Sequence, residues 1–308
     1  MTQIPNLRLA TRACPVCGET VRYSVFAEQL LDAERWTAAA FSSRKLPEYM
    51  HFRVLRCSTC RVLYSSPAPD PETISSLYRS ASFEARAESI WAARGHAQLI
   101  RAARLSMETR ILDIGAGDGT FLEALLDLGF RDVLGIEPST APIERASARV
   151  KPLLKQLSFK GENFKPESFD LITCLQTIEH VFHPAELARD VLRLLRPGGK
   201  FLVVCHNSRS LSARLLGTRS PIFDVEHLQI FSKDSLRFLF EVAGYHQSHI
   251  RMFWNTYPAE YWAKLFPFPD RVKRAALRFL SSSGVGRFPI PLAAGNLIAW
   301  AEKKNTLR

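Results

Sequence analysis

From about residue 110 onward, the chain alternates short apolar runs with amphipathic stretches. Six apolar runs have the length of buried strands, at 111–114, 133–137, 169–175, 200–205, 245–253 and 296–302. Segments with apolar residues at helical spacing separate most of them, at 120–128, 141–150, 184–196 and 233–243. Strands that alternate with helices predict right-handed crossovers. We therefore expect an α/β fold with a doubly wound, mostly parallel, seven-stranded sheet covered on both faces.

A glycine-rich turn directly follows the first predicted strand, with the sequence Gly115-Ala116-Gly117-Asp118-Gly119. Glycine lets the backbone approach a ligand without an intervening side chain. In sheets of this kind ligands bind beyond the carboxyl ends of the strands, where the strand order reverses. Glu137 ends the second predicted strand, where a carboxylate can accept hydrogen bonds from both hydroxyls of a ribose. The pattern predicts a cofactor with a ribose at this edge.

The charges near the turn indicate which cofactor it accepts. The dinucleotide fingerprint Gly-x-Gly-x-x-Gly places a pyrophosphate at a helix N-terminus. Here the spacing is Gly-x-Gly-x-Gly, with Asp113 before the turn and Asp118 inside it. Two carboxylates would repel a pyrophosphate but attract a cofactor that carries an ammonium and a sulfonium. The sequence therefore favours S-adenosylmethionine over a dinucleotide.

Four of the six cysteines form two Cys-x-x-Cys pairs, Cys14/Cys17 and Cys57/Cys60. Two such turns can supply the closed tetrahedral thiolate set of a structural Zn²⁺ site. The 39 residues between the pairs exceed the usual spacing of about 15–20, so we expect an inserted helix at 27–41. The alternative is two unrelated thiol pairs with redox activity.

Proline-rich sequence at 64–71 separates the cysteine segment from the rest. We expect a zinc-binding module with a helical insertion at 1–66 and a linker with a helical cover at 67–107. In that cover, helices over 71–105 are interrupted near Ser80 and Gly95. The α/β domain is expected at 108–308.

The charge balance permits several partners and selects none. The chain has 308 residues and a net charge of +11, but its basic residues are scattered. Nucleic acid is therefore not the expected partner.

Residues 1–13 do not resemble a signal peptide and no apolar run is long enough to cross a bilayer, so we expect a cytoplasmic protein. The aromatic segment at 252–269 suits either core packing or a pocket for the acceptor, including a lipid-linked one. The basic amphipathic stretch at 271–279 suits contact with an anionic membrane surface.

Taken together, these motifs resemble the class I S-adenosylmethionine-dependent methyltransferases. Residues 111–119 look like their first motif, 133–139 like their ribose-binding strand end, and 169–181 like the motif that borders the transferred methyl group. The turn at 194–199 is similar to the one before their fifth strand. The resemblance implies that the cofactor is bound by Asp113, Gly115, Ala116, Gly117, Asp118, Gly119, Glu137, Pro138, Leu175 and Gln176.

The paired cysteines and the segment from Glu226-His227 to Ser232 are similar to bacterial methyltransferases that act on sugars. This resemblance implies methyl transfer to oxygen or carbon of a small-molecule acceptor such as a sugar or sugar-nucleotide. It places Glu226 and His227 at the substrate site and His180 beside the methyl group. We expect His227 to be the base, because histidine titrates near neutrality, with Glu226 assisting and His180 as the second choice. For either histidine, the alternative is packing or turn capping.

Two other functions remain open at this point. The net charge and the expected zinc module would also suit an RNA methyltransferase, although no base-methylation motif or basic stripe is present. A protein that binds the cofactor without catalysis is the third interpretation.

Overall fold

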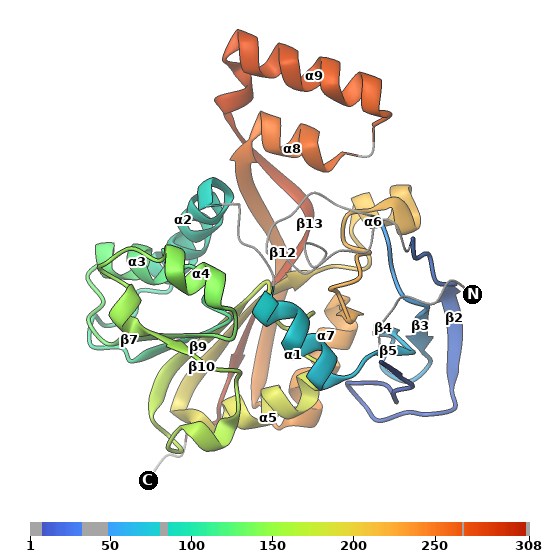
Figure 1. The fold of residues 1–308 in the computed structure, drawn as a ribbon. Coiled ribbons are helices and arrows are strands. Elements are labelled where there is room, and N and C mark those ends of the chain that lie inside the picture. Colours follow the sequence, from blue (N-terminus) through green and yellow to red (C-terminus); the bar gives the residue numbers. More distant parts are fainter. Residues whose placement is uncertain (1–7, 33–48, 81–85, 267, 306–308) are drawn as a thin grey trace.

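A seven-stranded sheet forms the centre of the computed structural model, which describes residues 8–32, 49–80, 86–266 and 268–305 (Figure 1). The strand order is β12-β13-β10-β9-β6-β7-β8. Five strands run parallel: β6 (Ile111–Ile114), β7 (Val133–Glu137), β8 (Leu154–Gln156), β9 (Phe169–Leu175) and β10 (Leu195–His206). β13 (Pro289–Glu302) is antiparallel to both β10 and β12 (Gln247–Pro258). The predicted fold class is confirmed.

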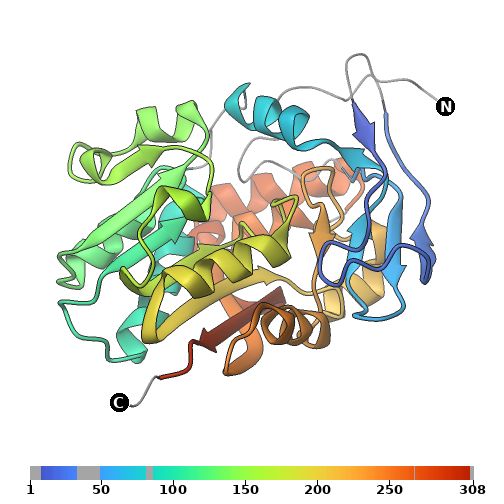
Figure 2. The same ribbon diagram turned by 90° about the horizontal axis from the view of Figure 1, so that it is seen from below.

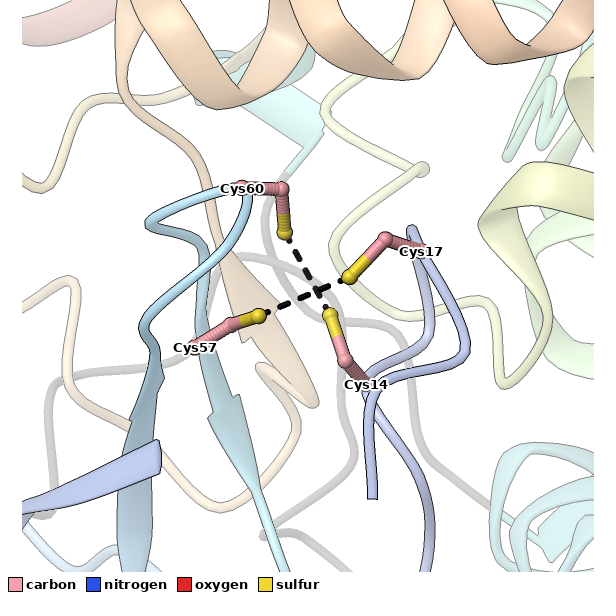
Figure 3. A group of neighbouring side chains, drawn as sticks. All are labelled: Cys14, Cys17, Cys57 and Cys60. Carbon is pink, nitrogen blue, oxygen red and sulfur yellow. Dashed lines mark hydrogen bonds between the residues drawn. The ribbon is translucent and has the colours of Figure 1, made fainter. Parts of the chain in front are cut away.

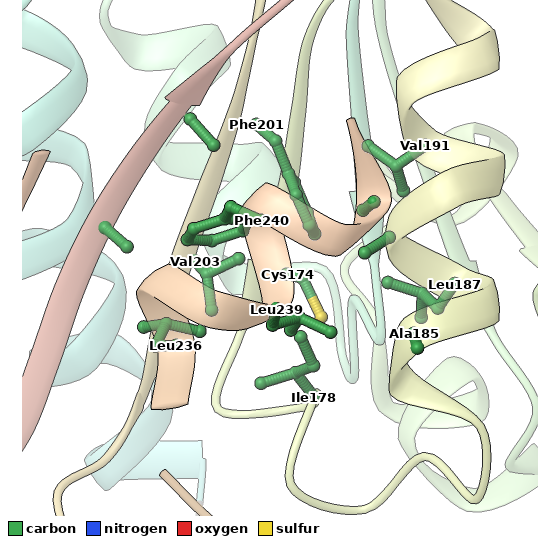
Figure 4. Close-up of a cluster of buried hydrophobic side chains, with 14 of the residues drawn as sticks. Cys174, Ile178, Ala185, Leu187, Val191, Phe201, Val203, Leu236, Leu239 and Phe240 are labelled. Atoms are coloured by element: carbon green, nitrogen blue, oxygen red, sulfur yellow. The ribbon is translucent and has the colours of Figure 1, made fainter. Parts of the chain in front are cut away.

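Helices cover both faces of the sheet, as expected for a doubly wound fold (Figure 2). On one face, α2 (Arg86–Ala102) and α3 (Thr120–Asp127) pack over Ile111, Leu171 and Leu202. On the other, α5 (Pro184–Leu194) and α7 (Lys233–Ala243) enclose side chains of β9 and β10, including Cys174 and Phe201 (Figure 4). Cys174 and Cys205 are fully buried and belong to this core.

The ends of α7 follow directly from its flanking residues. Ser232 accepts a hydrogen bond from the backbone N–H of Ser235, and the Ser235 hydroxyl accepts one from the backbone N–H of Ser232, which completes a capping box. Gly244 ends the helix with φ of 96°, a conformation that favours glycine. Both ends agree with the sequence prediction.

Several elements differ from the sequence expectations. The edge strand β8 was not anticipated, because its three residues have no apolar run. The expected helix at 141–150 is only α4 (Thr140–Arg145), and the 3₁₀ turns η2 (Lys151–Leu153) and η3 (Gly161–Asn163) follow. Helix α2 continues through Gly95, where packing beside Phe253 outweighs the low helix propensity of glycine. The other helix of this segment, α1 (Pro71–Ser80), ends at Ser80 as expected.

A second sheet carries the paired cysteines. Its strand order is β11-β4-β3-β2, with β2 (Tyr23–Ala27), β3 (Val54–Cys57), β4 (Leu63–Ser65) and β11 (Gln229–Ile230), and β1 (Leu9–Ala10) pairs separately with β5 (Ala68–Pro69). The helix expected from residue 27 does not start there, because Ala27 ends β2 and Leu30 bridges His51 in an extended conformation. Residues 33–41 of that expectation lie outside the described residues.

The hairpin of β12 and β13 extends beyond the end of β10. Its distal part carries α8 (Ala259–Leu265), α9 (Asp270–Ser283) and η5 (Val285–Arg287), which form an arm at the top of Figure 1. Residues of α6 (Leu211–Leu216) also line the cavity described below, and η4 (Gly217–Arg219) follows this helix. No helix in the described parts of the chain combines the length and apolarity needed to cross a membrane.

Candidate active site and metal centre

The glycine turn after β6 forms the floor of a cavity. Gly115, Gly117 and Gly119 have φ of 77°, 55° and 73°, which a side chain would strain. A Cβ on Gly115 would lie 2.3 Å from Oγ1 of Thr177, so this position has no space for alanine. A Cβ on Gly117 would meet no atom within 4 Å, so it would extend into the cavity. Gly119 does not line the cavity; its Cα faces Val150 instead.

Two buried carboxylates stand at the carboxyl ends of neighbouring strands. Glu137 accepts hydrogen bonds from the backbone N–H groups of Gly117 (3.0 Å) and Ser139 (2.8 Å). Asp113 accepts one from the hydroxyl of Thr173 at 2.6 Å. Burial raises the pKa of Asp113 to about 7 and also raises the pKa of Glu137. A cation bound here would stabilise both charged forms.

Asp118 holds the start of α3. Its Oδ1 accepts hydrogen bonds from the backbone N–H and the hydroxyl of Thr120. Its Oδ2 is buried and has no hydrogen-bond partner among the described residues, although Asp118 lines the cavity. A buried carboxylate oxygen of this kind is a candidate acceptor for a ligand.

His180, Glu226 and His227 lie together and also line the cavity. The rings of His180 and His227 are 4.9 Å apart, and Glu226 Oε1 lies 4.0 Å from Nε2 of His227. Nδ1 of His227 donates to the carbonyl of Ile222 at 2.9 Å. This bond fixes the neutral tautomer in which Nε2 carries the lone pair.

One cavity of about 1480 Å³ joins these features. It exceeds the usual volume for a single small ligand, roughly 300–1,000 Å³, and is large enough for a cofactor and an acceptor together. Every predicted cofactor residue except Gly119 lines it: Asp113, Gly115, Ala116, Gly117, Asp118, Glu137, Pro138, Leu175 and Gln176. The three predicted acceptor-side residues line it as well.

The sequence prediction missed several polar residues of the cavity and its wall. Nδ1 of His206 lies 2.9 Å from Oδ1 of Asn296, and burial lowers the pKa of His206 to about 4. Glu179 is fully buried behind it, accepts the backbone N–H of His206, and burial raises its pKa to about 8. A signal was present, because His206 directly follows a predicted strand at the ligand-binding edge.

Comparison with known proteins places this arrangement in a family. A family model described as "Methyltransferase domain" matches residues 72–249, more than half of the chain. The chain belongs to the methyltransferase-domain family. The match contains the glycine turn, Glu137 and the acceptor-side residues, and begins in α1.

Curated methyltransferases are similar over part of the chain. The ubiquinone biosynthesis O-methyltransferase of Pseudomonas fluorescens is 30% identical over 118 residues, which cover 35% of this chain and 50% of that protein. The mitochondrial enzyme of the same name from Schizosaccharomyces pombe is 35% identical over 115 residues, covering 35% of this chain and 41% of that protein. The chain thus matches half or less of the length of these relatives.

A solved structure shows the same fold. The YcgJ protein of Bacillus subtilis has a TM-score of 0.50 and 19% identity, with 68% of this chain and 99% of that chain covered. At this identity the similarity supports the methyltransferase fold, in agreement with the strand order.

The residues of the cavity fit the cofactor of methyltransferases. Asp113 and Glu137 are anionic groups that a sulfonium and an ammonium would stabilise. Asp118 offers an acceptor oxygen, and Gly117 leaves space that a side chain would fill. These observations suit S-adenosylmethionine.

The four paired cysteines converge on one point (Figure 3). Sγ of Cys14 lies 3.4 Å from Sγ of Cys60, Sγ of Cys17 lies 3.5 Å from Sγ of Cys57, and all four lie within 4.8 Å of one another. Tetrahedral Zn²⁺ with Zn–S bonds of about 2.3 Å requires S···S separations of about 3.8 Å. Three of the four residues are buried, as in a closed structural site. The quartet therefore fits Zn²⁺ better than two separate redox pairs.

Arg12 connects the cysteine module to the active-site wall. Its buried guanidinium donates to the carbonyl of Phe182 and to Oε1 of Gln229, and stacks 4.3 Å from the ring centre of Phe182. Burial lowers the pKa of Arg12 to about 10, which leaves it charged near neutrality. Gln229 lies two residues after His227 and begins β11. This strand pairs with β4, which belongs to the cysteine sheet.

Proposed function

We propose that this protein transfers the methyl group of S-adenosylmethionine to a small-molecule acceptor. One observation carries the proposal: Glu137 and the His180–Glu226–His227 cluster line the same cavity. The carboxylate of Glu137 can accept further hydrogen bonds, as ribose hydroxyls would donate, and the cluster contains a histidine suited to remove a proton. A protein that only binds the cofactor would have no need of this histidine cluster.

When bound, the cofactor supplies an electrophilic methyl group on sulfur. Glu137 holds the ribose hydroxyls through the lone pairs that remain on its two oxygens, and the N–H groups of Gly117 and Ser139 keep the carboxylate in place. Asp113 compensates the positive charge of the methionine part. Holding the methyl donor beside an oriented acceptor accounts for much of the rate enhancement in such transfers.

His227 is the proposed general base. Nε2 of His227 would accept the proton of an acceptor hydroxyl as that oxygen takes the methyl group that the bound cofactor would supply. The carbonyl of Ile222 stabilises the imidazolium through the Nδ1–H bond, and Glu226 adds a negative charge 4.0 Å away. A base of this kind contributes about 10²–10⁴-fold to the rate.

For the acceptor we propose a hydroxylated small molecule, with a sugar or sugar-nucleotide as the specific class. Oxygen methylation agrees with the names of the curated relatives, which are O-methyltransferases. The sugar class is supported by the combination of a Cys-x-x-Cys quartet with a Glu-His pair before a capped helix. Methylation of a carbon atom, after His227 removes a proton from it, is the alternative reaction. Analysis of the product would distinguish it from methylation of oxygen.

Calorimetry and methyl incorporation test the proposal in two stages. Titration of the wild type with S-adenosylmethionine and with its demethylated product should give saturable binding. The Glu137→Ala variant should show no binding of either compound. Tritiated methyl transfer into a panel of sugar-nucleotides, hydroxylated aromatics and RNA should then label one small-molecule class. Absence of binding would refute the proposal, and labelling of RNA alone would replace the acceptor class.

A further inference from the structure

The mouth of the cavity is lined by large apolar side chains exposed to solvent. Leu211 and Leu215 of α6 are 69% and 74% exposed, and Trp254, Phe266 and Leu292 of the arm are 59%, 46% and 39% exposed. All five line the cavity. Isolated exposed apolar residues are ordinary, but a group surrounding a ligand site indicates contact with something apolar.

Helix α9, on the same arm, presents a second group of exposed apolar side chains. Val272 and Phe279 are exposed at positions seven residues apart, so they lie on one side of the helix. Arg271, Arg274 and Arg278 are exposed along the adjacent side. The helix packs on α8 and η5, so the arm is folded on itself while this side remains open.

The charges around the mouth have one dominant sign. Residues 208–222 contain three arginines and no acidic residue, and residues 254–294 contain six basic and two acidic residues. Arg214, Arg219 and Arg287 are exposed beside the apolar groups on the two sides of the mouth. Mixed apolar and basic side chains of this kind complement the interface of an anionic lipid bilayer.

We propose that this mouth surface, comprising α6 and the outer face of the arm, docks on an anionic bilayer. The cavity then opens onto the lipid, so the acceptor is a lipid-anchored molecule whose polar part reaches the wall of His227. The statement about the acceptor rests on the proposed function, whereas bilayer docking does not. A nucleic acid would be attracted by the charges but would leave Leu215 and Phe279 without an apolar partner.

Vesicle sedimentation with the full chain tests the docking. The protein should sediment with phosphatidylcholine vesicles that contain about 30% phosphatidylglycerol, and far less with phosphatidylcholine alone. The variant Arg271→Glu/Arg274→Glu/Arg278→Glu should lower the partition coefficient at least tenfold. Val272→Ser/Phe279→Ser should also lower the partition coefficient. Its effect should be larger at high salt, because screening weakens the electrostatic attraction and the apolar contacts then account for most of the binding. The matched control Lys151→Glu/Lys155→Glu/Arg189→Glu changes exposed residues on β8, η2 and α5 and should sediment like the wild type.

The outcomes separate the two proposals. Calorimetric binding of the demethylated cofactor by all variants shows that they are folded and that the cofactor site is intact. Absence of vesicle binding by a protein that binds the cofactor overturns the docking and leaves the proposed function standing. An equal loss in the control variant, or displacement of the protein from vesicles by an RNA oligonucleotide at equimolar phosphate, shows general basicity and also overturns it.

Discussion

The hydroxyl of Tyr78 in α1 is hydrogen-bonded to Nδ1 of His180 at 2.8 Å. Helix α1 thereby reaches the segment after β9, which is 102 residues away in the chain. The same nitrogen lies 3.1 Å from the carbonyl oxygen of Glu226. The imidazole of His180 therefore contacts both α1 and the segment that carries Glu226 and His227. Tyr78 therefore orients His180.

Tyr78→Phe removes this hydrogen bond while keeping the packing of the ring. We expect turnover to fall about tenfold, the value of one hydrogen bond to a positioned group, with cofactor affinity unchanged. Steady-state kinetics together with calorimetry measure both. A fall in cofactor affinity equal to the fall in turnover would instead indicate that α1 acts only by closing the cofactor site.

His227→Gln should lower turnover by about 10²–10⁴-fold, because it removes the base while preserving a polar side chain. Cofactor affinity should change less than threefold. The matched control is His249→Gln on the exposed face of β12, which should behave like the wild type. An unchanged rate at saturating substrate would exclude His227 from the proton transfer.

Glu137→Gln keeps the shape of the side chain but removes its charge. Hydrogen bonds to charged groups contribute roughly 1.5–3 kcal/mol, so the affinity for S-adenosylmethionine should fall about ten- to a hundredfold. Calorimetry gives the affinity directly, and Glu144→Gln on the exposed side of α4 is the control. Equal affinities for wild type and Glu137→Gln would remove this residue from the cofactor site.

The cysteine quartet predicts one zinc ion per chain. Cys60→Ser should abolish bound zinc and lower the unfolding temperature, because metal binding contributes folding free energy. Elemental analysis measures the ion and scanning calorimetry the stability. Cys174→Ala is the control, since this buried cysteine lies outside the quartet and its change should leave the zinc content at one.

Glu179 should make stability fall as pH rises. Its pKa is raised from 4.5 to about 8 by burial, so between these values the folded state keeps a proton that the unfolded state has released. The free energy of unfolding therefore decreases through this window, by a few kcal/mol in order of magnitude. Glu179→Gln removes this contribution. Denaturant titrations at pH 5 and pH 8.5 should show a smaller loss for Glu179→Gln than for the wild type or for Glu241→Gln, an exposed change on α7.

Four of the five parallel strands could be predicted because their sequences are apolar, and β6 and β7 lead into a glycine turn or end at a carboxylate. The turn at Gly115 and the carboxylate of Glu137 follow local rules, so their positions were accessible from short segments of sequence. His180 and His227 were connected only through resemblance, because no local pattern brings together residues 47 positions apart.

Other features depend on long-range contacts that the sequence does not display. Strand β11 has two residues, too few for any periodicity, and exists because β4 offers it hydrogen bonds. Tyr78 lies in an amphipathic helix like many others, and only the tertiary structure shows that its hydroxyl meets His180. The continuation of α2 through Gly95 likewise depends on packing beside Phe253.

The pairing of β11 with β4 limits how this chain can be divided or recombined. A gene fragment that encodes only residues from 67 onward would leave Gln229 and Ile230 without their neighbouring strand and without the guanidinium of Arg12. The loop just before them, which carries Glu226 and His227, would lose these contacts. The amino-terminal segment and the transferase core therefore have to be inherited, expressed and engineered as a single unit.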